Sequence, residues 1–95
     1  MNLPGAFELR QNNPNPFARF TRFRFRLRQP ENVRLELLDL TGRRLRLLLA
    51  GKRAAGEHEA MWNGRDEQGI LLPCGIYFYR LTTDRGQMTR KMIVY

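Results

Sequence analysis

The sequence contains a single cysteine and a single histidine, and this scarcity excludes several kinds of site. Cys74 alone cannot form a disulfide within the chain. His58 alone, without a second ligand or a nucleophile, makes neither a metal site nor a catalytic triad. No nucleophile–base pair, metal-ligand cluster or glycine-rich phosphate loop is visible in the sequence. We therefore expect a protein that is not an enzyme and that holds no metal or cofactor.

Long apolar runs are also missing. No run approaches the roughly 20 residues needed to cross a bilayer, so we expect no membrane span. Residues 1–6 have neither the basic nor the apolar region of a signal peptide. A chain of 95 residues can bury one core but not a core and a deep cleft. We therefore expect one domain over residues 1–95, with residues 1–6 as a flexible lead-in.

Acidic residues are few beside basic ones. Nine Asp and Glu face 17 Lys and Arg, which gives a formal net charge of +8. Such a surface attracts polyanions such as nucleic acid, anionic lipid or acidic polysaccharide. Nucleic acid is the least favoured of these, because no exposed aromatic motif is interleaved with the basic residues and no helix is expected to enter a groove.

The dominant period of the apolar residues is two, which is typical of strands with one buried and one wet face. In residues 21–28, Phe23, Phe25 and Leu27 fall on one face and four arginines on the other. Turn-forming residues, including residues 29–32, separate this run from the others. The remaining strands are expected near residues 7–10, 33–37, 43–49, 57–63, 75–83 and 87–95.

A helix competes with a strand at residues 45–50, because Leu and Arg are both good helix formers. The turn expected at residues 39–42 and Gly51 favour the strand, with Leu45, Leu47 and Leu49 alternating on one face. Seven strands that recur every eight to twelve residues indicate an all-β antiparallel sandwich. The expected core consists of Phe23, Phe25, Leu35, Leu37, Trp62, Tyr77 and Tyr79.

Several segments together resemble a known family. They are residues 9–17, the "LELLDLTGRRL" stretch with the residues before it, and residues 56–58, 62–66, 69, 75–81 and 90–94. In order and spacing they are similar to the type A C-terminal sorting domain of the type IX (Por) secretion system. They are equally similar to the related immunoglobulin-like domain of the flagellar hook-capping protein. The resemblance runs from about Phe7 to Tyr95.

The resemblance implies an immunoglobulin-like antiparallel sandwich of about seven strands, fused behind an unrelated cargo. In the sorting family the outer-membrane export machinery recognises this tail, which is usually cleaved after export as the cargo joins an anionic lipopolysaccharide. This implies a secreted or cell-surface location, reached through the periplasm. The implied partners are export proteins or neighbouring subunits, with anionic envelope polysaccharide as a further candidate. The alternative is a structural subunit of an extracellular or flagellar assembly that polymerises through its sheet edges. Two departures are the missing cargo and the unusually basic strand at residues 22–28.

Three elements are predicted to serve recognition: the loop at residues 12–17, the hairpin at residues 39–44 and the last strand. Their candidate residues are Asn13, Asn15, Phe17, Arg43, Arg44, Arg90 and Lys91. The loop has two alternative interpretations. Its asparagines and carbonyls can bind a cation, but such sites usually need several carboxylates. We favour a rigid turn set by Pro14 and Pro16, with Phe17 plugging the end of the sandwich.

The arginine stripe, which is Arg22, Arg24, Arg26 and Arg28, is the most unusual surface feature. Its members lie about 6.6–7 Å apart along one strand, so they can match the repeating charges of a polyanion. The favoured alternative is a solvated face that discourages edge-to-edge aggregation. Ile76 and Phe78 have the opposite parity to Tyr77 and Tyr79, so if the strand at residues 75–83 has a wet face, these two are expected to be exposed and to mark a contact patch.

The remaining candidates favour structural roles. Trp62, Tyr77 and Tyr79 can form a stacking platform, but their alternation favours the core. Asp66 and Glu67 are a carboxylate pair, and turn-amide binding is favoured for Asp66 over acid–base chemistry. His58 is expected to be partly buried, since it shares parity with Trp62. Cys74 is expected to act as a small apolar residue, with thiol crosslinking as the alternative.

Overall fold

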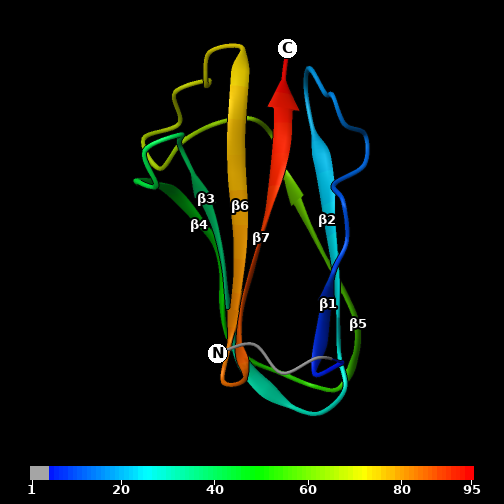
Figure 1. The fold of residues 1–95 in the computed structure, drawn as a ribbon. Helices are drawn as coiled ribbons and strands as arrows, with labels where there is room; N and C mark the ends of the chain where they lie inside the picture. The colour runs from blue at the N-terminus through cyan, green and yellow to red at the C-terminus, as the bar shows by residue number, and fades with distance from the viewer. Residues whose placement is uncertain (1–4) are drawn as a thin grey trace.

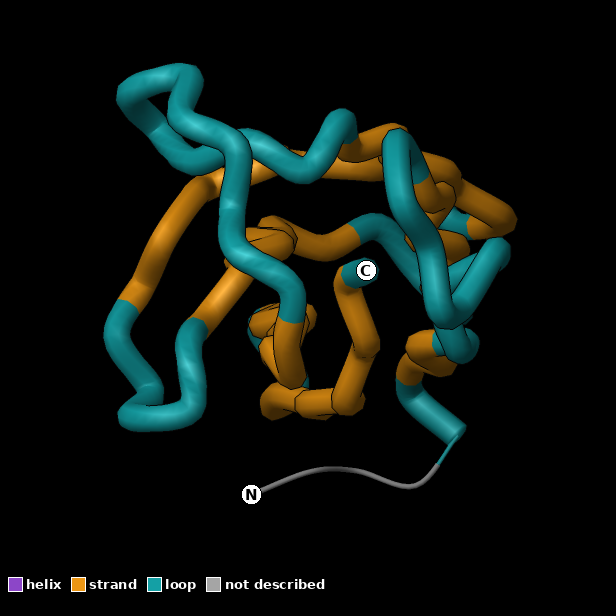
Figure 2. The backbone as a smooth tube through the Cα atoms, turned by 90° about the horizontal axis from the view of Figure 1, so that it is seen from above, coloured by secondary structure: helices purple, strands orange, loops and turns teal. Residues whose placement is uncertain are grey.

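The computed structural model describes residues 5–95 and places seven strands in two antiparallel sheets (Figure 1). One sheet has the order β1-β2-β5 and the other has the order β4-β3-β6-β7. Seen from above, the two sheets form separate layers (Figure 2). The predicted all-β, immunoglobulin-like sandwich is confirmed. The strands are β1 (Phe7–Leu9), β2 (Thr21–Leu27), β3 (Glu31–Leu38), β4 (Arg44–Arg53), β5 (Gly56–Trp62), β6 (Gly75–Thr83) and β7 (Gly86–Val94).

The core lies between the layers and is built from the inward positions of both sheets. Six of the expected core residues are fully buried, and Tyr77 is half-buried and packs against them. The six are Phe23, Phe25, Leu35, Leu37, Trp62 and Tyr79. Phe23 contacts Tyr79 across the sandwich, with 4.6 Å between ring centroids. Aromatic side chains thus contribute directly to the contact between the two sheets, beside the aliphatic side chains of the core.

Strand β4 differs from its prediction. It runs on to Arg53, with Gly51 inside the strand instead of after it. Its pairing with β3 shifts register twice, between Leu35 and Glu36 and between Leu37 and Leu38. A bulge inserts an extra residue and inverts the parity of the residues beyond it. Leu48 and Leu49 consequently both pack against the core, and the expected alternation of leucines is wrong.

Strand β3 also begins earlier than expected. Glu31 and Asn32 belong to the strand and not to the turn predicted at residues 29–32. The N–H of Asn32 donates to Asp84 Oδ2 at 2.9 Å, which joins the start of β3 to the β6–β7 hairpin. Of the predicted lead-in, residues 1–4 lie outside the described residues, and Ala6 packs against the core. Within residues 5–95 there is no helix long and apolar enough to cross a membrane.

Candidate functional site

Two of the predicted recognition elements lie side by side in the structure. The proline loop, defined as residues 11–17, runs along the outer edge of β7 near the C-terminus (Figure 1). The N–H of Phe17 donates to Ile93 O at 3.2 Å, and the N–H of Tyr95 donates to Phe17 O at 2.8 Å. Asn15 Oδ1 accepts from the N–H of Ile93 at 2.9 Å. The loop therefore holds the end of the chain in place.

A buried hydrogen-bond network shapes the inner side of the proline loop. Asn12 Nδ2 donates to Thr21 Oγ1 at 3.0 Å and to Pro14 O at 3.2 Å. The N–H of Asn12 donates to the Tyr79 hydroxyl at 2.8 Å, and that hydroxyl donates to Arg10 O at 2.7 Å. The amides of Asn12 and Asn15 are thus engaged in holding the loop, which supports the rigid turn over a cation site.

Tyr79 is neutral in this network. Burial raises the pKa of its hydroxyl to about 12, although the N–H of Asn12 and the charge of Arg90 act in the opposite direction. A neutral hydroxyl can both accept from Asn12 and donate to Arg10, whereas a phenolate can only accept. The network therefore depends on the protonated form of Tyr79.

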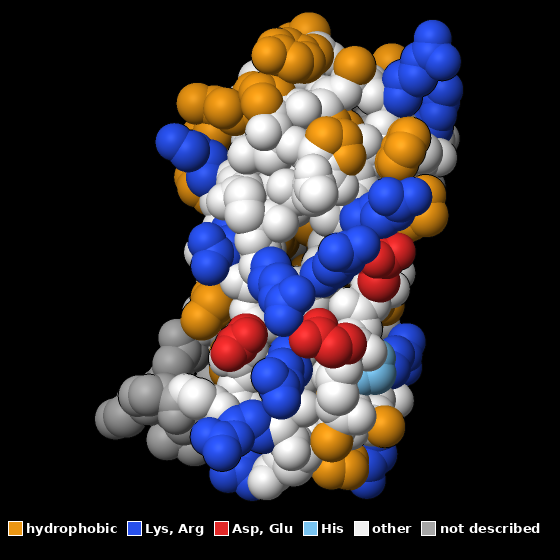
Figure 3. Space-filling view, turned by 90° about the vertical axis from the view of Figure 1, so that its right-hand side faces the viewer, with side chains coloured by type: hydrophobic (Ala, Val, Ile, Leu, Met, Phe, Trp, Pro, Cys, Tyr) orange, Lys and Arg blue, Asp and Glu red, His pale blue; other side chains and the backbone are white. Residues whose placement is uncertain are grey.

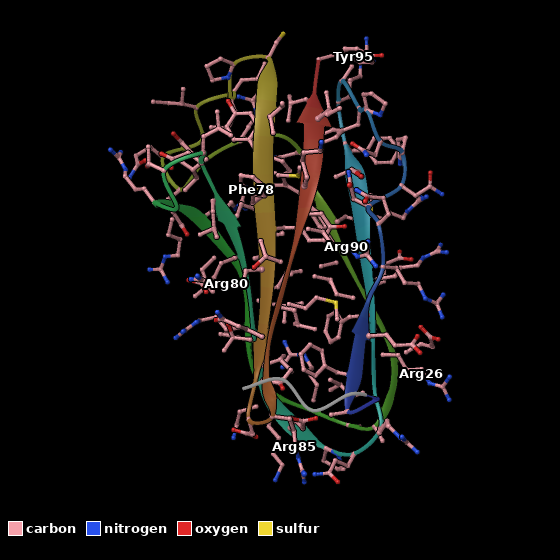
Figure 4. The ribbon with its side chains drawn as sticks, viewed as in Figure 1. Arg26, Phe78, Arg80, Arg85, Arg90 and Tyr95 are labelled. Carbon is pink, nitrogen blue, oxygen red and sulfur yellow. The ribbon has the colours of Figure 1, made fainter. Side chains whose placement is uncertain are left out.

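Some predicted recognition residues support the fold instead of facing a partner. The Phe17 ring is only 2% exposed and packs edge-on against Trp62, at 5.5 Å between centroids. Its side chain is therefore not available for direct contact. Arg90 Nε donates to Leu9 O and so links β7 to β1 (Figure 4). Asn13 and Lys91 are exposed, and they remain candidates for contact with a partner.

The hairpin at residues 39–44 is stabilised by one carboxylate. Asp39 Oδ1 accepts from the N–H and the hydroxyl of Thr41, at 2.9 and 2.6 Å, and from the N–H of Arg43 at 3.0 Å. The Thr41 hydroxyl is the main cause that lowers the pKa of Asp39, with the two N–H groups also contributing. Gly42 adopts φ 86°, which favours glycine. The turn thus holds Arg43 in an exposed position.

The arginine stripe is partly neutralised by a neighbouring strand. Figure 3 shows a run of basic side chains on the outer face of the β1-β2-β5 sheet, with acidic side chains beside it. Arg24 pairs with Glu59 at 2.9 Å, and Arg22 lies 3.6 Å from the same carboxylate. Among the described residues, Arg26 and Arg28 have no ion pair. Glu59 was not evident from the sequence, because the antiparallel register, not sequence distance, places it opposite Arg24.

A second charged cluster occupies the opposite outer face of the sandwich. The carboxylate of Glu36 on β3 is only 5% exposed and lies among three arginines. Its oxygens are 3.3 Å from Arg34, 3.6 Å from Arg44 and 3.2 Å from Arg80. Only the Arg34–Glu36 spacing was readable from the sequence, since the other two arginines come from neighbouring strands. Of the predicted residues, Arg44 belongs to this cluster.

The other candidate residues have structural contacts. Asp66 Oδ1 accepts from the N–H groups of Gln68 and Ile70, both at 2.9 Å, as expected for a turn. His58 Nε2 lies 2.7 Å from Ala54 O, and its ring stacks on Phe25. Cys74 is exposed. Within the described part of the chain, no group of three or more His, Cys, Asp or Glu could hold a metal ion.

Comparison with known proteins gives consistent matches. The sequence profile of the FlgD Ig-like domain family matches residues 17–87. The basal-body rod modification protein FlgD of Salmonella typhimurium is 34% identical over 67 residues, which are 70% of this chain and 29% of that protein. FlgD of Salmonella typhi matches with the same figures. The chain thus spans less than a third of these curated relatives.

Solved structures extend the similarity. Dimeric latent PorU from Porphyromonas gingivalis gives a TM-score of 0.74 at 29% identity, over 93% of this chain and 9% of that chain. FlgD from P. aeruginosa gives 0.60 at 24% identity, over 78% of this chain and 58% of that one. PorZ, described as an essential surface component of the type-IX secretion system of P. gingivalis, gives 0.59 at 18% identity, over 97% and 12%. The last two similarities show the fold alone.

Proposed function

Because the chain belongs to the FlgD Ig-like domain family, we propose that it is a non-catalytic module for export and attachment. In this proposal it directs a fused cargo to the bacterial cell surface, where export proteins recognise it. The observation that carries the proposal is the similarity to latent PorU, which covers 93% of this chain but only 9% of that chain. A domain of this kind therefore occurs as a small part of a much larger protein.

The structure supports a role for the C-terminal strand. The proline loop holds Ile93 and Tyr95 through hydrogen bonds to their backbone groups, two from the Phe17 backbone and one from the Asn15 side chain. These bonds leave the outward side chains of β7 accessible. Lys91 is exposed on this strand, and Asn13 is exposed on the loop beside it. An export protein would then bind a surface that is already ordered, which lowers the entropic cost of binding.

Export of a reporter fusion tests the proposal. A secreted reporter fused ahead of residues 1–95 is expected to reach the surface of a bacterium that has a type IX system. Deletion of residues 91–95 is expected to abolish its surface display, because the deletion removes the strand end that the proline loop holds. Surface display is measured by protease accessibility and by antibody labelling of intact cells.

A folding control separates loss of recognition from loss of structure. The deletion exposes a sheet edge and removes core residues Met92 and Val94, so circular dichroism of the purified domain must accompany it. Exchange of two exposed residues from different elements, Asn13→Ala with Arg43→Ala, keeps the core intact and is expected to reduce display several-fold. Normal display of both variants would overturn the export role.

A structural subunit is the second candidate, favoured by the 34% identity to the Salmonella FlgD proteins. Polymerisation by strand addition needs a free edge. The end of β7 is covered by the proline loop, and the start of β4 is covered by Glu67, whose Oε1 accepts from the N–H of Leu47 at 2.7 Å. The β4 edge beyond Leu48 has no such cover among residues 5–95, and β5 forms an outer edge of the other sheet, so assembly would use one of these two edges.

Sedimentation distinguishes the two candidates. An assembly subunit is expected to form oligomers as its concentration rises, whereas an export module is expected to stay monomeric. The net charge of +8 opposes self-association at low salt, so the experiment needs both low and physiological ionic strength. A monomer at about 1 mM under both conditions would exclude assembly through these sheet edges at physiological concentrations.

A further inference from the structure

Four side chains form one row across the outer face of the four-stranded sheet. The register pairs Arg44 on β4 with Leu38 on β3, Leu38 with Phe78 on β6, and Phe78 with Lys91 on β7. Residues that face each other across antiparallel strands point to the same side of the sheet. The row therefore has two apolar residues at its centre and a cation at each end.

The apolar centre continues into the next row. Ile76 on β6 pairs with Ile93 on β7, and Ile76 is 42% exposed. Leu38 is buried although it lies on the outer face, whereas Phe78 and Ile93 are half-buried. We define these four residues as the apolar strip. Leu38 lies beneath its accessible part, which is formed by Phe78, Ile76 and Ile93 on β6 and β7. The sheet fixes the shape of this surface before any partner arrives.

The residues around the apolar strip include more cationic side chains than carboxylates that could pair with them. Arg34, Arg44 and Arg80 share the single carboxylate of Glu36. The Nε of Arg80 is buried without an acceptor among the described residues, and Lys91 has no ion pair there. An apolar centre inside a rim of incompletely paired arginines is the usual composition of a protein-binding hot spot.

We propose that this face binds an extended, acidic segment of a partner protein, with an apolar side chain on the strip and carboxylates at Arg44 and Lys91. Strands lie about 4.8 Å apart, so three strand spacings separate the two cations by roughly 14 Å. In an extended chain, residues four apart are about 13 Å apart and face the same side. The predicted motif is therefore acidic–x–apolar–x–acidic, and it fits whether the module serves export or assembly.

Other occupants fit the surface less well. An acidic polysaccharide lacks an apolar side chain for Phe78 and Ile76, and it would bind the arginine stripe on the other face equally. A second copy of this chain brings the same charge of +8. Two of its exposed carboxylates, Glu57 and Glu59, are already paired with arginines. Charge complementarity therefore favours an acidic protein segment.

Titration of ¹⁵N-labelled protein with a nine-residue peptide tests the proposal. The probe has a Glu-Ser-Phe-Ser-Glu centre between Gly-Ser ends, and it is expected to shift amide signals of residues 38–44, 76–78 and 91–93. Lys91→Glu is expected to weaken binding about tenfold, as is replacement of the peptide's Phe by Ala. Arg26→Glu makes the same charge change on the opposite outer side of the sandwich (Figure 4) and is expected to change affinity less than about twofold.

Ile76→Thr supplies an apolar-strip variant that preserves the fold, because Ile76 is exposed and threonine is a good strand former. It is expected to weaken binding about threefold to tenfold. Three results would each overturn the proposal: no shift at about 1 mM peptide, equal losses for Lys91→Glu and Arg26→Glu, or shifts centred on the arginine stripe. If heparin displaces the peptide and shifts the amide signals of both outer faces equally, the surface would be assigned to polyanions instead. Shifts that depend on protein concentration alone would assign it to a second copy.

Discussion

Replacement of Tyr79 by phenylalanine is expected to lower the free energy of unfolding by about 2–4 kcal/mol. The Tyr79 ring is fully buried, so phenylalanine fills the same space and removes only the hydroxyl. The N–H of Asn12 and the carbonyl of Arg10 then lose their partners, which lie 2.8 and 2.7 Å from that hydroxyl. A buried polar group left unpaired costs about 1–3 kcal/mol. Urea unfolding followed by circular dichroism measures the change.

Tyr77→Phe is the matched control. The Tyr77 hydroxyl donates to Pro73 O at 2.7 Å in an exposed position, where water replaces the lost bond. We expect this substitution to cost less than about 1 kcal/mol. Equal effects of the two substitutions would contradict the role assigned to the buried network. Loss of the proline loop's contacts on β7, seen by amide exchange of Ile93 and Tyr95, is expected for Tyr79→Phe only.

Alkaline pH tests the same hydroxyl without mutation. The pKa of Tyr79 is about 12 in the folded protein, above the ordinary tyrosine value of 10.0. The unfolded state therefore loses its proton first as pH rises. The raised pKa stabilises the folded state by roughly 2–3 kcal/mol. This stabilisation is fully present below pH 10 and is lost as pH rises from about 10 to 12. Tyr79→Phe is expected to remove this part of the alkaline slope, and an unchanged slope would contradict the assignment.

Two strands were predictable from sequence for different reasons. β2 differs from its predicted bounds by one residue, because it alternates strictly between an apolar and a polar face. β6 matches its predicted bounds, because a β-prone stretch with apolar residues on both faces lies between Gly75 and the turn at residues 84–86. β4 was not predictable in detail, since Leu45, Leu47, Leu48 and Leu49 allow several registers. The pairing with β3 selects among them and inserts two irregularities. A residue pattern encodes which face is apolar, but it does not encode where a neighbouring strand forces a bulge.

The sequence allowed the individual elements of the candidate surfaces to be predicted, but not the contacts that bring these elements together. The proline loop and the last strand are both evident in the sequence, but nothing there shows that Asn15 caps Ile93, 78 positions away. The same limit applies to charge. The arginine stripe is visible because its residues alternate on one strand, whereas its pairing with Glu59 depends on the β2–β5 register. Contacts between distant strands decide which cations remain available to a partner.

Glu36→Gln tests how strongly such a cross-strand contact stabilises the fold. We expect it to lower the free energy of unfolding by about 1–3 kcal/mol, because it removes the one carboxylate that three arginines share. The effect stays below that of a fully buried pair, since the arginines are 30–52% exposed and water can solvate them. Urea unfolding at about 0.05 and 1 M NaCl is expected to show a smaller loss at high salt.

Glu59→Gln provides the control on the opposite face. Glu59 also contacts two arginines, but it is 43% exposed, so its loss is expected to cost at most about 1 kcal/mol. The two variants are also expected to differ in peptide binding. Glu36→Gln removes an internal competitor for Arg44 and Arg80 and is expected to strengthen binding of the acidic peptide several-fold, whereas Glu59→Gln is not. Equal behaviour of the two variants would mean that Glu36 neither stabilises the sheet nor restrains the arginines beside the apolar strip.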